Sequence, residues 1–315
     1  MFVSIASLRQ PTFRSQLSQS RPLGQSIRDY LDDELVARAE LVRRKIKIAA
    51  KAAREDHGAT ACVFFTLPEF FWNIPWREVR NEEELHELNA AYLEKVPACI
   101  ALLMTELPVE RYGKVVLLAG SCATLIKVGE GESSYYDVIN YLLAITNKEY
   151  EVDIPLMSMW PKRHVSGIDF GKHLASEGDF WLFKISEEIE VKVKKLSSVR
   201  AEHSYFGGYE GKFINSLVNG CPFAINLCLD YYSLKEGERD IQVELAEAKI
   251  DFLIACGLPF NYAKRHPSSL QFSIRNDGMG DGEVEVVRLQ SGWIVESVPS
   301  VKIEDDLHLT LIEVV

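Results

Sequence analysis

The sequence predicts an α/β layered fold, and three observations support the prediction. Short apolar runs alternate along the chain with longer segments in which apolar residues recur at helical spacing. The apolar runs are continuous, which is typical of strands buried on both faces. From residue 270 onward short alternating segments follow one another, which is typical of hairpins. With 315 residues, of which 47% are hydrophobic, we expect a single domain spanning residues 1–315.

The first half of the chain contains most of the helical signal. Apolar positions recur at helical spacing over residues 26–54, and Asp56, His57 and Gly58 supply the stop. A polar stretch near residues 11–25 predicts a loop or an insertion. The remaining elements expected here are strands at residues 2–6, 61–65 and 114–121, a helix at residues 82–107, and an extended segment at residues 135–145.

The second half is predicted to be richer in strands. Residues 169–200 contain many Lys, Glu and Ser residues, and we expect an insertion there. The elements expected after it are a strand at residues 223–229, a helix at residues 240–249, a buried strand at residues 252–256, and hairpins from residue 270 onward.

Charge and cysteine content exclude several classes of protein. The net charge of −11 argues against binding to nucleic acid or to an anionic membrane. Six cysteines lie mostly in apolar runs and form no CxxC pair, which argues against a zinc ribbon or a disulfide framework. Without a signal-like start or an apolar run long enough to span a bilayer, we expect a soluble cytoplasmic protein with reduced thiols.

Three segments each place one reactive side chain where a strand meets a loop. Glu69 follows Pro68 at the end of one apolar run, and Lys162 precedes an Arg-His pair. Cys228 ends another apolar run, two residues before Asp230. Each residue alone has an ordinary explanation, as a surface carboxylate, a solvated lysine or a core cysteine.

The order of these residues and their contexts resemble the Glu-Lys-Cys triad of the nitrilase superfamily of carbon–nitrogen hydrolases. The matching motifs are Pro68-Glu69, Lys162-Arg163-His164 and Cys228-Leu229-Asp230. The resemblance covers most of the chain and implies an αββα sandwich, with two central mixed sheets flanked by helices. It also implies a homodimer or a higher homo-oligomer.

The segment around Glu202 resembles the part of the N-carbamoyl amino acid amidohydrolase branch that carries a second active-site glutamate. Glu202 lies 26 residues before Cys228, and we expect it to orient Lys162 and the attacking water. Glu177 is the alternative for this role.

Physical chemistry gives each member of the triad a task. A free thiol has a pKa of about 8.5, so Cys228 needs a base within reach, and Glu69 can be that base if burial raises its pKa. Lys162 would favour the thiolate and stabilise the oxyanion, with the backbone N–H of Leu229 as a second donor.

Four residues beside the triad are predicted to contact the substrate: Phe70, Trp72, Leu229 and Tyr231. The residue after the cysteine is usually aromatic in the family, whereas this chain has Leu229. The pocket wall therefore differs there, and the substrate cannot be carried over from the family.

The sequence thus predicts a cysteine-dependent hydrolase of a non-peptide carbon–nitrogen bond in a small amide or carbamoyl substrate. The chemistry needs no cofactor, and the histidines lack the spacing of a metal site. A nitrile hydrolase, an acyltransferase using the same triad, and a silent binding protein with the same fold are the alternatives.

Overall fold

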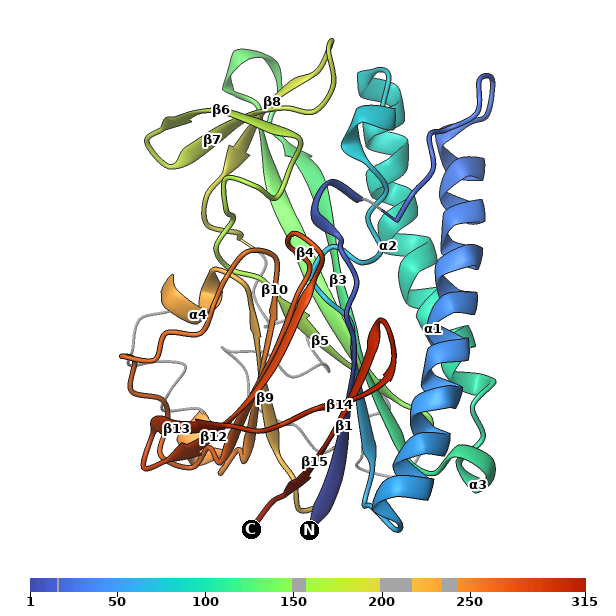
Figure 1. Cartoon of the computed structure of the whole chain (residues 1–315). Coiled ribbons are helices and arrows are strands. Elements are labelled where there is room, and N and C mark those ends of the chain that lie inside the picture. The colour runs from blue at the N-terminus through green and yellow to red at the C-terminus, as the bar shows by residue number, and fades with distance from the viewer. Residues whose placement is uncertain (16, 149–156, 199–216, 234–242) are drawn as a thin grey trace.

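The computed structural model describes residues 1–315 except residue 16 and residues 149–156, 199–216 and 234–242. Its strands form two mixed sheets, and its two long helices lie on one side of the molecule (Figure 1). The helices are α1 (Ile27–His57), α2 (Glu82–Thr105), α3 (Val109–Tyr112) and α4 (Asp230–Ser233), with 3-10 turns at Phe13–Ser15, Trp76–Glu78 and Gly131–Ser133.

The first sheet has ten strands. Their order is β14 (Val301–Glu304), β15 (Leu307–Glu313), β1 (Phe2–Leu8), β2 (Val63–Thr66), β3 (Val115–Val128), β4 (Tyr135–Thr146), β8 (Glu190–Lys194), β7 (Phe180–Lys184) and β6 (Lys172–Glu177), and β5 (Met157–Pro161) also pairs with β4. Strands β1, β2 and β3 run parallel, and β5 points the same way because β4 is antiparallel to both β3 and β5. The segments that follow β1, β2 and β5 therefore leave the sheet in the same direction.

The second sheet has five strands. Their order is β13 (Trp293–Ser297), β12 (Glu283–Gln290), β11 (Phe272–Asp277), β10 (Ile250–Ala255) and β9 (Phe223–Leu227). Strands β9, β10 and β11 are parallel, and β12 and β13 continue the sheet as antiparallel hairpins.

The two sheets pack face to face through apolar side chains. Phe64 of the first sheet touches Phe223 and Phe252 of the second, with ring centroids 5.1 Å apart in both pairs. Aromatic pairs at this spacing add stability beyond the area they bury. These contacts hold the inner faces of the two sheets against each other.

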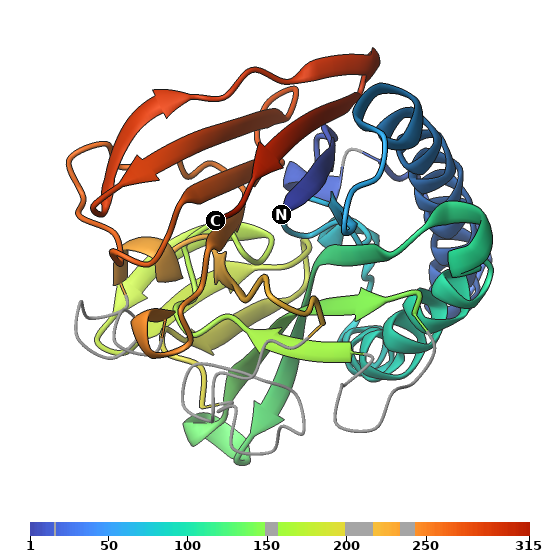
Figure 2. The ribbon, with the colours of Figure 1, turned by 90° about the horizontal axis from the view of Figure 1, so that it is seen from below.

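The outer face of the first sheet is covered by α1 and α2, which Figure 2 shows together on one side of the molecule. Ser26 caps α1 by accepting a hydrogen bond from the Asp29 backbone N–H, and Gly58 ends the helix at a φ of 70°. The short helix α4 lies on the other side of the molecule, beside the second sheet (Figure 1). Among the described residues, no helix is both long and apolar enough to cross a membrane.

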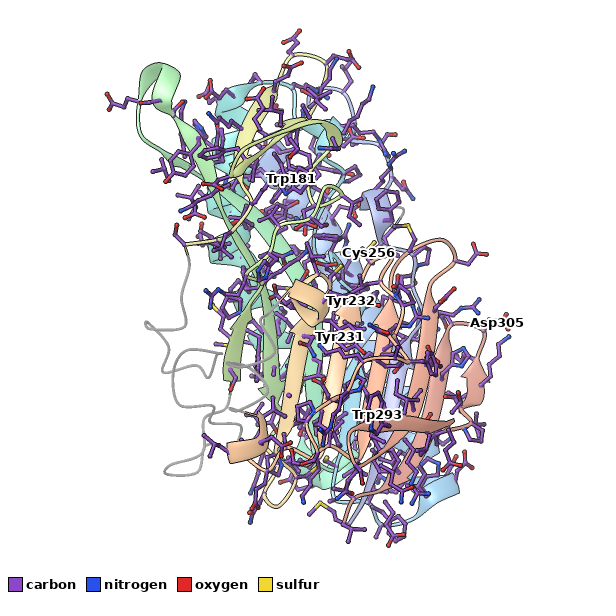
Figure 3. All side chains as sticks on the ribbon, turned by 90° about the vertical axis from the view of Figure 1, so that its left-hand side faces the viewer. Trp181, Tyr231, Tyr232, Cys256, Trp293 and Asp305 are labelled. Carbon is purple, nitrogen blue, oxygen red and sulfur yellow. The ribbon has the colours of Figure 1, made fainter. Side chains whose placement is uncertain are left out.

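Strands β6, β7 and β8 form an extension of the first sheet, built from the region in which the sequence predicts an insertion. It joins β4 through the pairing of Tyr136 with Val193. Figure 3 shows Trp181 on this extension, well above Trp293 of the second sheet. The segment that joins β5 to β6 and the turn between β7 and β8 lie near the end of the first sheet at which β1, β2 and β5 finish.

The predicted α/β layered fold with two mixed sheets and flanking helices is confirmed. One difference is β3, which was expected to end at Ser121 and instead continues to Val128. The pairing with β4 shifts register between Leu118 and Ser121, which places a bulge at Ala119 and Gly120, and the strand continues beyond it. A second difference is the helix expected at residues 240–249, of which only residues 243–245 are helical among those described.

Candidate active site

Glu69 lies in the loop that follows β2, in contact with both sheets. Its backbone N–H donates to the carbonyl of Ala255 in the second sheet at 3.4 Å. Its carbonyl accepts a hydrogen bond from the hydroxyl of Thr12, at 2.5 Å. The side chain is completely buried, so the carboxylate sits at the boundary between the sheets rather than in solvent.

The bulge in β3 makes room for this loop. Gly120 has a φ of +65°, and a Cβ there would lie 2.4 Å from the carbonyl oxygen of Pro68. The next residue, Ser121, accepts a hydrogen bond from the backbone N–H of Phe70 at 3.1 Å. The backbone conformation at Phe70, with a φ of 61°, is rare for a residue with a side chain and is held by these contacts.

Lys162 follows β5, and its ammonium group reaches Glu69. The Nζ atom lies 2.9 Å from Oε1 of Glu69 and 5.7 Å from the centre of the Phe70 ring. The Lys162 backbone N–H donates to the carbonyl of Asn140 at 2.7 Å, and the amide of Asn140 donates to the same Glu69 oxygen at 3.3 Å. The lysine and the carboxylate are therefore held in one buried hydrogen-bonded group.

Asp169 is the functional candidate that sequence reasoning missed. Both of its carboxylate oxygens accept from Lys162, at 2.9 and 2.8 Å, and its side chain is fully buried. Ser166 holds the carboxylate from the other side, its hydroxyl 2.6 Å from Oδ1. An aspartate seven residues after the lysine was the available signal, but it opens the region in which the sequence predicts an insertion.

Cys228 occupies the turn between β9 and α4. Its φ of 45° marks a sharp turn, and its backbone N–H donates to the carbonyl of Ile254 in β10 at 2.9 Å. The thiol donates to the carbonyl of Cys256 at 3.8 Å, and it lies close enough to Glu69 for the two groups to shift each other's pKa. The second carboxylate oxygen of Glu69, Oε2, is buried and has no hydrogen-bond partner among the described residues.

Asp230 joins the cysteine segment to the lysine segment. Its carboxylate accepts from the backbone N–H groups of Arg163 and His164, both at 2.8 Å, and from Nδ1 of His164 at 2.9 Å. The side chain of Asp230 is completely buried. The second residue after the cysteine thus fixes the backbone directly after Lys162.

The electrostatic state of the group follows from burial and from the buried charges. Burial raises the pKa of Glu69 to about 7, although Lys162 lowers it in part. Burial alone would lower the pKa of Lys162, but Asp169 and Glu69 hold it well above its usual value. Burial and Glu69 raise the pKa of Cys228 well above its usual value, against the effect of Lys162. At neutral pH the lysine is therefore charged and the thiol protonated, while the glutamate is divided between its two forms.

A cavity of about 430 Å³ lies beside this group. It is bordered by the loops after β1, β2 and β5 and by the turn between β7 and β8. Among the described residues, its lining includes Phe70 and Asp169 but not Trp72, Leu229 or Tyr231.

The other predicted contact residues have different surroundings. Trp72 is buried in the core, where its indole N–H donates to the carbonyl of Ala119 at 2.5 Å. Leu229 is half-buried directly after Cys228. Tyr231 is buried, and its hydroxyl lies 2.8 Å from Nε2 of His266. Figure 3 shows Tyr231 and Tyr232 beside the second sheet, below Cys256.

The candidate for a second active-site glutamate cannot be placed, because Glu202 lies outside the described residues. Its alternative, Glu177, is exposed on the extension. All six cysteines are free thiols. Within the described ranges, no three His, Cys, Asp or Glu side chains are grouped so that they could hold a metal ion.

Comparison with known proteins gives likenesses to solved structures but no match in sequence. No family model matches the chain, and no curated protein matches it. It is similar to the crystal structure of a glutamine-dependent NAD(+) synthetase from Cytophaga hutchinsonii, with 8% sequence identity and a TM-score of 0.41. The likeness covers 100% of this chain and 43% of that chain, so this chain spans less than half the length of that protein.

Proposed function

We propose that the protein hydrolyses a carbon–nitrogen bond of a small amide or carbamoyl compound through a thioester at Cys228. The proposal has Glu69 as the general base and acid, Lys162 as the oxyanion stabiliser, and Asp169 as the residue that orients Lys162. It rests above all on one observation. Loops from the two sheets bring a thiol, an ammonium group and a buried carboxylate together: Lys162 donates to Glu69 at 2.9 Å, and Cys228 and Glu69 are close enough to shift each other's pKa.

The resting thiol favours a mechanism in which Glu69 takes the proton as the bond forms. The sulfur attacks the carbonyl carbon while its proton passes to Glu69, and a negative oxygen develops. Glu69 then gives the proton to the nitrogen, the C–N bond breaks, and ammonia or an amine leaves. Water attacks the thioester, Glu69 accepts a proton from it, and the C–S bond breaks as the proton returns to sulfur.

Lys162 can serve the oxyanion without losing its position. An ammonium group has three N–H donors, and here they face one oxygen of Glu69 and two of Asp169. One donor can turn to the developing oxyanion while Asp169 keeps another. The backbone N–H of Leu229 is the proposed second donor, and the loss of one such donor typically costs about 10²- to 10³-fold in rate.

The proposal is tested with a panel of candidate substrates and two measurements. Primary amides, carbamoyl compounds and nitriles are incubated with the protein, ammonia is measured, and the acyl-enzyme is sought by intact mass. We expect ammonia release together with an acyl adduct on the peptide that contains Cys228. Interception of the acyl group by added amines would identify an acyltransferase, and an inert, unmodified protein across the panel would favour a binding protein.

The rate should depend on the ionisation of Glu69. Because the base must be ionised, kcat/KM is expected to rise with pH and to level off above an inflection near pH 7, set by the pKa of about 7. A profile measured between about pH 5 and about pH 9 checks this. A rate that stays constant through this range would contradict the role of Glu69.

The same pKa shift has the opposite effect on stability. The folded-state pKa lies above the unfolded value of about 4.3, so the folded protein binds the proton more tightly. The stability that Glu69 contributes is present below that value and is lost as the pH rises through about 7. Urea unfolding of the native protein and of Glu69→Gln should therefore show a shallower pH dependence in the variant.

Replacing Asp230 by asparagine should slow turnover because an amide nitrogen cannot accept a hydrogen bond. One of the contacts to the backbone after Lys162 would be lost, and hydrogen bonds to charged groups are worth about 1.5–3 kcal/mol. We expect kcat to fall by about tenfold or more, with a smaller change in KM. Asp305→Asn is the matched control, since Asp305 lies on the hairpin of β14 and β15 (Figure 3). Equal kinetics in the two variants would contradict a positioning role for Asp230.

A further inference from the structure

The cavity beside the candidate active site carries more positive than negative side chains. Arg14, Arg77, Lys172 and Lys184 line it, whereas its acidic lining residues are Asp169 and Glu187. The whole chain has a net charge of −11, so this local excess runs against the overall composition. A positive cavity in an acidic protein favours an anionic ligand.

Two of the four cations form no close ion pair with any of the described residues. Lys184 pairs with Glu187 at 2.7 Å, and the Asp169 carboxylate is already held by Lys162. Arg77 pairs with Glu78 at 3.4 Å. The two without a close ion pair are Arg14, whose guanidinium lies over the Phe13 ring, and Lys172, which acts on Glu187 from a longer distance and lowers the pKa of that carboxyl. Arg14 also has a φ of 57°, a conformation that costs free energy in a residue with a side chain and is often retained at binding sites.

The cavity adjoins the reacting groups through three contacts of its lining. Thr12 donates its hydroxyl to the carbonyl of Glu69. The Phe70 ring lies 5.7 Å from the ammonium nitrogen of Lys162, and Asp169 holds the same nitrogen at 2.8 Å. A molecule in the cavity would therefore lie beside the triad.

The remaining walls suit a short carbon chain. Trp76 and Ile168 line the cavity together with the Phe70 ring, and its volume of about 430 Å³ is in the range of small-molecule sites. The planar guanidinium of an arginine matches a carboxylate, which it can bind through two parallel hydrogen bonds. Apolar walls with a cationic side fit a chain that ends in a carboxylate.

Building on the proposed function, we infer that the substrate is a small amide whose other end carries a carboxylate, held by Arg14 and Lys172. The amide carbon would face Cys228, and the carboxylate would face the loop after β1 and the start of β6. The two cations would fix the orientation of the substrate, and the triad would perform the hydrolysis.

Binding of glutarate and of its uncharged diamide, glutaramide, tests the inference without any turnover. We expect isothermal titration calorimetry to give a glutarate affinity at least about tenfold higher, which corresponds to about 1.4 kcal/mol. Equal affinities, or no binding by any dicarboxylate from succinate to adipate, would overturn the inference. Tighter binding of inorganic phosphate than of every dicarboxylate would overturn the assignment to a carboxylate.

Two double variants distinguish a local effect of Arg14 and Lys172 from an effect of the net charge of the protein. Arg14→Gln combined with Lys172→Gln should remove the preference for glutarate over glutaramide. Arg28→Gln combined with Lys302→Gln removes the same charge from exposed ion pairs on α1 and β14, and it should leave the preference unchanged. An equal loss of preference in both double variants would show a long-range charge effect and overturn the assigned site.

Turnover then distinguishes this inference from the proposed function. The monoamide of glutaric acid should be hydrolysed with a higher kcat/KM than glutaramide, and only the Arg14 and Lys172 double variant should lose that difference. Hydrolysis of both compounds at equal rates would refute the carboxylate site and leave the proposed function intact. Binding of glutarate by a protein that never forms an acyl-enzyme would refute the proposed function and leave the anion site intact.

Discussion

Replacing Cys228 by alanine is expected to lower kcat for amide hydrolysis by at least about 10⁴-fold, because no other group can form the acyl-enzyme. The fold should tolerate the change, since the backbone N–H of residue 228 keeps its hydrogen bond to Ile254. Ammonia release measures the rate, and intact mass shows whether the acyl adduct has disappeared.

Cys99→Ala is the matched control for this variant. Cys99 is a partly buried free thiol on α2, and its loss should leave turnover and the acyl adduct unchanged. Cys228→Ser keeps a nucleophile of similar shape, but a hydroxyl is far harder to activate. Full activity in Cys228→Ala would contradict covalent catalysis at this residue.

Replacing Lys162 by methionine should damage both stability and activity. The variant leaves the carboxylates of Glu69 and Asp169 buried without their cation, and breaking a buried pair in this way costs about 3–5 kcal/mol. Urea unfolding at pH 8 should show this loss, and turnover should fall below detection because the oxyanion loses its charged donor. The loss should be smaller near pH 5, where Glu69, whose pKa burial raises, can take up a proton.

A compensated variant separates the two effects. Lys162→Met combined with Glu69→Gln and Asp169→Asn has no buried charge at these positions, so most of the lost stability should return. Activity should not return, because the base and the oxyanion donor are both missing. If the single variant were as stable as the native protein, the close grouping of these three side chains would be wrong.

The sequence predicted that Glu69 and Cys228 follow the ends of buried strands, and the structure has them there. Continuous apolar runs located the ends of β2 and β9, but these strands belong to different sheets, and the sequence alone did not show how the two sheets pack together. Glu69 and Cys228 were found in this way. The motif that follows Lys162 added the third residue, and its pairing with Asp230 gives that motif a physical reason.

Side-chain direction was less predictable. Phe70, Phe71 and Trp72 are equally apolar, and nothing in their order shows which of them faces the cavity. The positive φ of Phe70 places its ring near Lys162, whereas Trp72 turns into the core toward Ala119. Asp169 was missed for a related reason, since burial of a carboxylate depends on a distant partner that composition does not reveal.

Cys228 and Glu69 follow strands of different sheets, and the aromatic contacts of Phe64 with Phe223 and Phe252 hold those sheets in position. A small sliding of one sheet over the other would separate sulfur from carboxylate while every strand stayed paired. On warming, hydrolytic activity should therefore be lost at a lower temperature than the secondary structure. Truncating one of these aromatic side chains should increase the difference between the two temperatures.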